Sequence, residues 1–471
     1  MSKIKYICTI VLGIALFSAC NKLDETAYSN ITPENFFTTK NDVNAALVAM
    51  YRPLQNCCGG PEQAGLFVLN LVSDEGTSNN SLWSQYDNLT YTPGSASEVR
   101  DLWTACYQSI SSSNFVLDNE KKIKELDTDP AFANSKLGEA RFMRAVNYFQ
   151  LVQMFGGVPL RTTMVNRADQ VNIPRSSEDS VYDLIISDLQ FAEQNLPPVP
   201  EMAGKPTKWA ASSYLAKVYL TRKDYSDALT KATEVYSQGP YLILPKFADV
   251  FDVENKNNAE VIFNLQYIRL NGQGMRIQDL AMGSYNPFAY QATTGWGLSN
   301  MEHDMYAQYN SIDDRINTTF APYVNKPTDK VDSQYVGKWR DVKGVSADGH
   351  GNDYILYRYA DLVLEVAESE NEVNGPTVKA YTAINTIRSR ANLPDLTAGL
   401  TKDQFRDSVL QERHLELNWE EWRWFDLKRT DRLKSTLIAD GKKWDDRYYL
   451  FPIPQSEIDA SNKVITQNPG Y

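Results

Sequence analysis

The sequence predicts a mostly α-helical protein, built as a scaffold of tetratricopeptide-like helix pairs with one large, irregular and partly β insertion. Two observations lead to this fold class. Long stretches of the chain place apolar residues at helical spacing, and one pair of such stretches carries a repeat pattern of small and large residues. Between about residues 240 and 355 the helical spacing fails, and this marks the insertion.

The first half of the chain is expected to contain four long helices. Their apolar spacing places them at about 41–52, 98–119, 136–154 and 178–196. Gly156-Gly157 follows the third helix and Pro197-Pro198 follows the fourth. Glycine is favoured just after a helix and proline cannot continue one, so both pairs predict helix ends.

The clearest repeat unit covers residues 209–240, where two consecutive helices are expected. Small residues such as Ala216 and Ala228 alternate with large ones at intervals that let paired helices approach closely. A looser copy of this pattern covers residues 359–391. We therefore expect helix pairs to recur along the chain within a single domain over residues 41–471.

The insertion is expected to combine a strand with irregular structure. Residues 261–267 have the composition of a strand, whereas residues 272–297 are rich in Gly, Asn, Pro and aromatic residues. The segment contains too many apolar residues for a free linker. It is therefore expected to pack against the helix pairs.

Composition excludes several classes of function. The 471 residues include 47 Lys and Arg against 59 Asp and Glu, a formal net charge of −12, so the basic face that nucleic-acid binding needs is not expected. The three histidines are far apart in sequence, which disfavours histidine-based catalysis and zinc sites. The 27 Tyr, 18 Phe and 9 Trp favour a binding protein instead.

The amino terminus predicts export and lipid attachment. The apolar run at residues 6–17 is shorter than the ~20 residues that span a bilayer and has the layout of a signal peptide. Ser18-Ala19 before Cys20 resembles a lipobox, in which the cysteine is acylated and becomes the first mature residue. We expect a signal peptide over 1–19 and a lipidated tether over 20–40. Ordinary secretion with a free Cys20 thiol is the alternative.

Three further cysteines lie in the body of the chain. Cys57 and Cys58 are adjacent and are followed by two glycines, which is not a metal-ligand spacing. An oxidising compartment would permit one of them to bridge to Cys106. The sequence leaves that pairing open.

Three segments carry a family resemblance. The first covers 139–149 and continues to Val158-Pro159-Leu160, the second covers 412–429, and the third covers 450–471. In this order, behind a lipobox, they resemble the SusD/RagB family of outer-membrane nutrient-binding lipoproteins. One departure is Glu420-Glu421-Trp422, where the family usually has Glu-Gly.

The resemblance implies a surface-exposed outer-membrane lipoprotein that binds glycans and is not an enzyme. Its implied partner is a SusC-like TonB-dependent β-barrel, to which it delivers oligosaccharide for import. The implied fold is mostly helical, with four repeat-type helix pairs supporting a ligand-binding face. Membrane attachment is implied through the lipid alone, and no cofactor is implied.

The best-matched charged residues are expected to be structural. Leu410, Leu417 and Trp424 recur at the spacing of one helical stripe, so this segment packs against the core. Charged residues on such a helix form ion pairs more often than ligand contacts. This interpretation covers Glu412, Arg413, Glu416, Arg141 and Arg144.

Two polar loops with aromatic residues, 73–91 and 283–297, are the candidate glycan site. The apolar face of a sugar stacks on an aromatic ring, and burying it contributes on the order of 1 kcal/mol. Amides and carboxylates then bind the hydroxyl groups. The candidate residues are Trp83, Trp296, Tyr86, Tyr285, Tyr290, Asp74, Asn80 and Asn286. The alternative is that the rings pin the two loops onto the scaffold.

A weak calcium motif occurs in residues 346–353. Asp348, Asn352 and Asp353 offer oxygen atoms, but their spacing does not fit an EF-hand. A solvated turn is the competing interpretation of this segment.

Other functions stay open at this point. The same architecture could bind peptides, since the resembled family includes peptide-uptake members, or the repeats could bind only proteins. A glycoside hydrolase would need two carboxylates about 5–10 Å apart. Asp74 and Glu75 are adjacent, so their side chains diverge in an extended loop. The glycan and its linkage cannot be derived from residue order.

Overall fold

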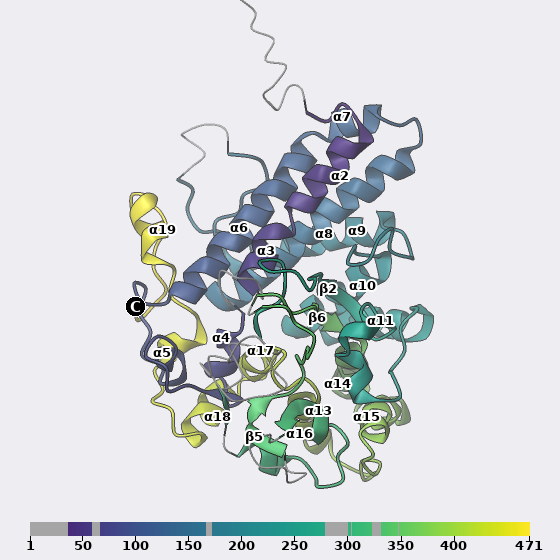
Figure 1. The fold of residues 1–471 in the computed structure, drawn as a ribbon, viewed down its shortest axis with the longest axis vertical. Coiled ribbons are helices and arrows are strands. Elements are labelled where there is room, and N and C mark those ends of the chain that lie inside the picture. Colours follow the sequence, from purple (N-terminus) through teal and green to yellow (C-terminus); the bar gives the residue numbers. More distant parts are fainter. Residues whose placement is uncertain are drawn as a thin grey trace, which may run out of the picture. The chain divides into compact units, whose positions relative to one another are not determined.

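The computed structural model describes residues 36–58, 66–165, 172–277, 300–302, 304–322, 331–346 and 348–471 (Figure 1). Residues 39–471 form one compact unit. Among the described residues, no helix combines the length and apolar character needed to cross a bilayer.

The amino-terminal half consists of long helices. Their bounds are α2 (Lys40–Ala49), α3 (Arg52–Cys58), α4 (Val68–Leu71), α5 (Ser84–Asp87), α6 (Ser97–Asp118), α7 (Glu120–Glu125), α8 (Pro130–Phe155) and α9 (Glu178–Asn195). All four predicted long helices are confirmed. Helix α8 begins earlier than predicted because Asp129 caps it, accepting a hydrogen bond from the backbone N–H of Ala131, with Pro130 at the first position.

The predicted repeat unit and its looser copy are both helix pairs. Their helices are α10 (Lys208–Thr221), α11 (Tyr225–Gln238), α14 (Tyr359–Asn374) and α15 (Val378–Arg390). Helix α11 packs on α10 and also on α14, so the two pairs are neighbours (Figure 1). The small residues Ala216 and Ala228 are buried, as close helix packing requires. The mostly helical fold class is confirmed, whereas the tetratricopeptide geometry itself stays a prediction.

The carboxy-terminal region consists of shorter helices. They are α16 (Lys402–Glu416), α17 (Arg423–Arg429), α18 (Leu433–Ala439), the 3₁₀ turn η5 (Asp446–Tyr449) and α19 (Gln455–Ala460). Helix α16 packs on α14 and α15, and α17 packs on α4 from the start of the chain. The carboxy-terminal region is thereby joined to the amino-terminal part of the unit over residues 39–471.

The insertion contains short elements, namely η2 (Phe247–Val250), η3 (Val253–Asn255), η4 (Met305–Gln308), α13 (Ile316–Thr319), β2 (Val261–Leu265), β3 (Asn300–Met301), β4 (Phe320–Pro322) and β5 (Val331–Val336). β2 confirms the predicted strand. It pairs antiparallel with β6 (Tyr354–Arg358), which leads directly into α14. β1 (Gly76–Thr77) pairs with β3, and β4 pairs with β5. The partly β insertion is thus fastened to the helices through β6.

A buried ion network centred on Arg358 joins the insertion to the carboxy-terminal helices. The guanidinium of Arg358 donates to Glu260 at 2.8 Å and to Glu416 at 2.6 Å. It also donates to both carboxylate oxygens of Glu420, at 2.7 and 2.9 Å. Lys338 donates to the same carboxylate at 2.6 Å. These charged side chains are at most 2% exposed, so each depends on its partners for stabilisation.

The predicted structural role of the motif charges is confirmed. Arg413 donates to Asp361 at 2.7 Å and to Asp426 at 2.8 Å. Glu412 and Glu416 both accept from Arg315, at 2.7 and 3.1 Å. On α8, Arg144 forms a two-point contact with Asp188, and Arg141 reaches the same carboxylate. Each of these five motif residues therefore has its charge paired within the protein.

The departure from the family pattern lies in a turn with unusual backbone angles. Trp419 and Glu421 have φ values of 59° and 62°, in the left-handed region that favours glycine. Glu421 is buried, and its carboxylate accepts from the side-chain amide of Asn70 at 3.4 Å. Burial raises the pKa of Glu421 to about 8. A buried carboxyl group with a raised pKa thus occupies the position where the pattern of the resembled family predicts glycine.

The structure also answers the open question about the cysteines. Cys57, Cys58 and Cys106 are all buried and all have free thiols. Burial raises the pKa of the Cys106 thiol well above its ordinary value. A protonated, buried thiol packs as a small apolar group.

Removing the centre of the buried network should be costly. We expect Arg358→Met to lower the free energy of unfolding by about 3–5 kcal/mol, because it leaves buried carboxylates without their cation. Chemical denaturation monitored by circular dichroism measures the change. The control is Arg432→Met, since Arg432 pairs with Asp407 at the surface and should contribute about 0.5 kcal/mol or less. Equal losses in the two variants would contradict this role for Arg358.

Candidate functional site

The aromatic rings of the first predicted loop are part of the core. Trp83 is 3% exposed and Tyr86 is 0% exposed. The indole N–H of Trp83 donates to Oε1 of Glu98 at 2.9 Å, and the hydroxyl of Tyr86 donates to Oε2 of the same carboxylate at 2.6 Å. Both rings therefore pin the loop onto α6. The prediction that Trp83 and Tyr86 stack on a sugar is wrong for this structure, because neither ring has a face open to a ligand.

The polar candidates of the same loop differ from one another. Asp74 forms a two-point contact with the Arg423 guanidinium, at 2.8 and 2.7 Å. Burial alone would raise the pKa of Asp74, but the hydrogen bonds and charge of the Arg423 guanidinium hold that pKa well below its usual range. Asp74 is thus a structural ion-pair partner. Asn80 is partly exposed and its Oδ1 accepts from the backbone N–H of Leu82 at 2.9 Å, so it orders a surface turn.

The second predicted loop and the lipid-attachment site lie outside the described residues. This concerns Trp296, Tyr285, Tyr290, Asn286 and Cys20. Their predicted roles stay predictions.

The predicted calcium ligands have protein partners. The side chain of Asp353 accepts from the amide of Asn264 and from the backbone N–H of Tyr267, both at 3.0 Å, and forms an ion pair with Lys256 at 2.5 Å. Asp348 accepts from the hydroxyl of Ser346. The amide of Asn352 points at backbone carbonyls. Calcium binding is still a prediction, and the ammonium of Lys256 on Asp353 argues against it.

Glu75, near the start of the first predicted loop, forms a buried pair with His414 of α16. Glu75 is 1% exposed, and its carboxyl Oε2 accepts from the backbone N–H of Trp419 at 3.2 Å. Burial, with the nearby charge of Asp74, raises the pKa of Glu75 to about 8. Burial lowers the pKa of His414 to about 3. At neutral pH a protonated carboxyl therefore faces a neutral imidazole, with 3.6 Å between Oε1 and Nε2.

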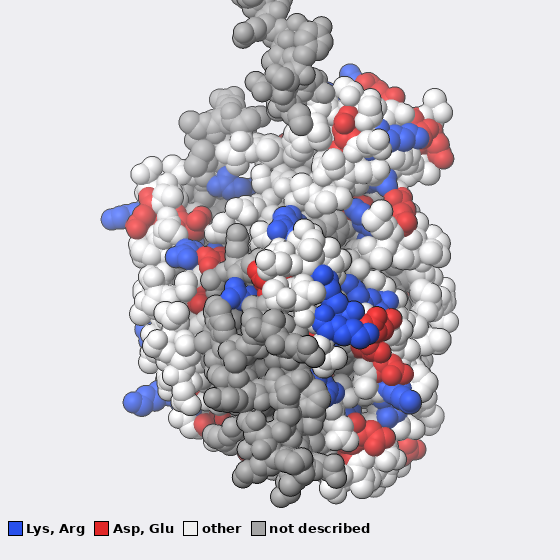
Figure 2. Space-filling model, viewed as in Figure 1, with Lys and Arg blue, Asp and Glu red and all other residues white. Residues whose placement is uncertain are grey.

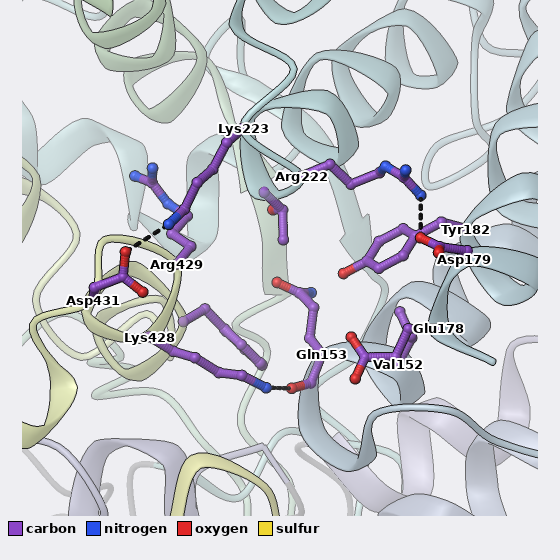
Figure 3. Close-up of a pocket in the computed structure, with 12 residues that line it drawn as sticks. Val152, Gln153, Glu178, Asp179, Tyr182, Arg222, Lys223, Lys428, Arg429 and Asp431 are labelled. Carbon is purple, nitrogen blue, oxygen red and sulfur yellow. Dashed lines mark hydrogen bonds and ion pairs between the residues drawn. The ribbon is translucent and has the colours of Figure 1, made fainter.

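A polar pocket lies between the end of α8, the start of α9, the end of α10 and α17 (Figure 3). Its cavity volume is about 340 Å³. Asp431 is held by Lys223 at 2.6 Å, and Asp179 lies 3.6 Å from Arg222. The ammonium of Lys428 donates to the carbonyl oxygen of Gln153 at 2.5 Å, and burial lowers its pKa to about 8. Two of the carboxylates that line this pocket thus form ion pairs at exposed positions.

A partly exposed tryptophan, Trp444, lies in the segment between α18 and η5. Trp339 is buried, at 3% exposure, whereas Trp444 is partly exposed. The ring of Trp444 meets that of Tyr449 edge to face, with 4.9 Å between centroids and 76° between planes. The charged residues on both sides of Trp444 are the sequence signal that indicates an exposed ring at this position. We call this pair the Trp444–Tyr449 step.

Charges of both signs are mixed on the surface. Figure 2 shows Lys and Arg interspersed with Asp and Glu over the described part of the face that it draws. This face has no broad basic region of the kind that nucleic acids require.

The pair of Glu75 and His414 predicts a pH-dependent stability. Because folding raises the pKa of Glu75, its stabilising contribution is complete below the unfolded value near 4.5 and is lost as the pH rises to about 8. We expect Glu75→Gln to match the wild type near pH 5 and to be more stable than it near pH 8.5. Thermal unfolding at both pH values, with Glu234→Gln on α11 as a partly exposed control, measures the difference. A gap between Glu75→Gln and wild type that does not change with pH would contradict the assignment.

Known proteins resemble this chain over nearly its whole length. A family model described as "SusD family" matches residues 317–471, and one described as "Starch-binding associating with outer membrane" matches residues 22–220. SusD-like protein P2 from Formosa agariphila is 27% identical over 99% of this chain and 100% of its own length.

Solved structures agree with the sequence comparison. A SusD superfamily protein from Bacteroides vulgatus has a TM-score of 0.80 at 24% identity, covering 93% of this chain and 100% of that one. A laminarin-binding SusD-like protein has a TM-score of 0.79 at 25% identity, covering 92% and 100%. The matching models at both ends of the chain, together with this fold, support a SusD/RagB family protein.

Proposed function

We propose that this protein binds oligosaccharides at the cell surface, held in the outer membrane by lipid on Cys20, and passes them to a SusC-like TonB-dependent transporter. The observation that carries the proposal is the match of residues 22–220 to a family model described as starch-binding and associating with the outer membrane. The likeness to a laminarin-binding relative over 92% of the chain supports the same class of ligand.

The proposed binding chemistry is ring stacking combined with hydrogen bonds to sugar hydroxyls. Burial of Trp83 and Tyr86 leaves Trp296, Tyr285 and Tyr290 as the stacking candidates from the two predicted loops. Asn80 and Asn286 are the proposed hydrogen-bonding partners. Amides suit this task because they both donate to and accept from hydroxyl groups.

We propose that the protein does not hydrolyse its ligand. Hydrolysis needs two carboxyl groups that face a sugar, one of them with a raised pKa. Glu75 and Asp74 have pKa values shifted in opposite directions, but Glu75 is 1% exposed and Asp74 is bound to Arg423. In the polar pocket, Asp179 and Asp431 are close to cations. Both observations support a binding protein.

Titration with sugar fragments tests the proposed function. We expect saturable binding of laminarin or starch fragments by isothermal calorimetry, with no reducing sugar released on prolonged incubation. Peptides of similar length serve as the comparison. Saturable binding of peptides alone would replace the glycan assignment, and release of reducing sugar would overturn the non-catalytic one.

Substitution of the acceptor cysteine tests the anchor. We expect Cys20→Ser to move the protein from the membrane fraction to the soluble fraction, because two or more acyl chains are needed for stable attachment. Metabolic labelling with a fatty acid should mark the wild type and not the variant. Cys58→Ser is a matched control. Cys58 is a buried free thiol, so this variant should keep the fatty-acid label on Cys20. Labelling of both Cys20→Ser and wild type would contradict the lipid assignment.

A further inference from the structure

We propose that the Trp444–Tyr449 step is a sugar-stacking subsite, with the carboxylate of Asp446 as its hydrogen-bonding partner. This inference rests on the proposed glycan-binding function. It concerns residues outside both loops in which ring stacking was predicted.

The two rings of the Trp444–Tyr449 step are held in a fixed orientation at the protein surface. The rings of Trp444 and Tyr449 are both partly exposed and stand at 76° to each other. A second ring, that of buried Tyr448, supports the indole with 6.1 Å between centroids. The indole N–H donates to Oδ1 of Asp446 at 2.8 Å, which fixes the ring orientation. A ring that is already held in place loses little conformational entropy when a ligand binds.

The polar groups beside the Trp444–Tyr449 step are suited to binding the hydroxyl groups of a sugar. The side chain of Asp446 is 72% exposed and also accepts from Lys434 at 3.0 Å. Its bonds from Trp444 and Lys434 lower the pKa of Asp446, so it stays ionised and accepts hydrogen bonds. Lys443 next to Trp444 is exposed and offers a donor. An apolar ring beside an exposed acceptor and donor matches the apolar face and hydroxyl rim of a pyranose.

The position of the step joins it to the first predicted loop. On one side of Trp444, Lys442 donates to Asp87 at 3.0 Å and to the carbonyl oxygen of Leu71 at 2.9 Å. On the other side, the hydroxyl of Tyr448 donates to the carbonyl oxygen of Leu89. The step is thus fastened at both ends to the segment that carries Asn80. A sugar chain held at Asn80 would contact the step only if it spans the distance between them, so this subsite predicts that affinity depends on chain length.

The experiment measures oligosaccharide affinity after removing the ring. Wild type, Trp444→Ala and Trp444→Phe are titrated by calorimetry with laminarin fragments and starch fragments of defined length. We expect Trp444→Ala to raise the dissociation constant about tenfold, from the loss of one stacked sugar. Trp444→Phe, which keeps a flat ring, should recover most of the affinity. The loss should appear only for fragments long enough to reach the step.

The matched control is Tyr236→Ala. Tyr236 is also a partly exposed ring in an aromatic pair, with Tyr359 on the helix-pair scaffold, and should leave affinity unchanged. Circular dichroism checks that each variant is folded. Unchanged affinity in Trp444→Ala would overturn this inference alone, because the wild type would still bind glycan. Failure of the wild type to bind any fragment would overturn the proposed function and the subsite with it.

Discussion

The structure depends on burying a dense set of opposite charges where the insertion meets the carboxy-terminal helices. Arg358 lies at the point where β6 becomes α14, and three glutamates from two distant segments, Glu260 in one and Glu416 and Glu420 in the other, converge on it. An unpaired charge at this depth would cost several kcal/mol, so the segments are constrained to one mutual arrangement. The network thereby specifies how an irregular insertion and a helical scaffold fit together, which apolar packing alone defines less sharply.

The helices could be predicted from sequence because their cause is local. Apolar spacing and the glycines and prolines at helix ends located α6, α9, α10 and α11 to within a few residues. The ion-pair role of Arg413 could be predicted for the same reason, since the stripe beside it marks a packed helix. What this reasoning could not supply was the identity of each partner, because Asp361 lies on a different helix.

The site was harder to predict because exposure is not a local property. Trp83 lies among polar residues, yet Glu98 on α6 accepts a hydrogen bond from its indole N–H and allows the ring to be buried. Trp444 lies in an equally polar segment and is partly exposed. The sequence alone does not distinguish buried Trp83 from partly exposed Trp444, because burial depends on the element against which each loop packs. The sequence therefore identified the segment 73–91 as rich in aromatic residues, but the predicted role of Trp83 and Tyr86 in sugar binding was wrong.

The raised pKa values of Glu75 and Glu421 have a consequence for the whole molecule. Both carboxyl groups hold a proton at neutral pH, so the folded protein is less negative than its formal net charge of −12. Unfolding would release those protons into the medium. Denaturation at neutral pH should therefore acidify an unbuffered solution, and the electrophoretic mobility of the native protein should be lower than its composition indicates.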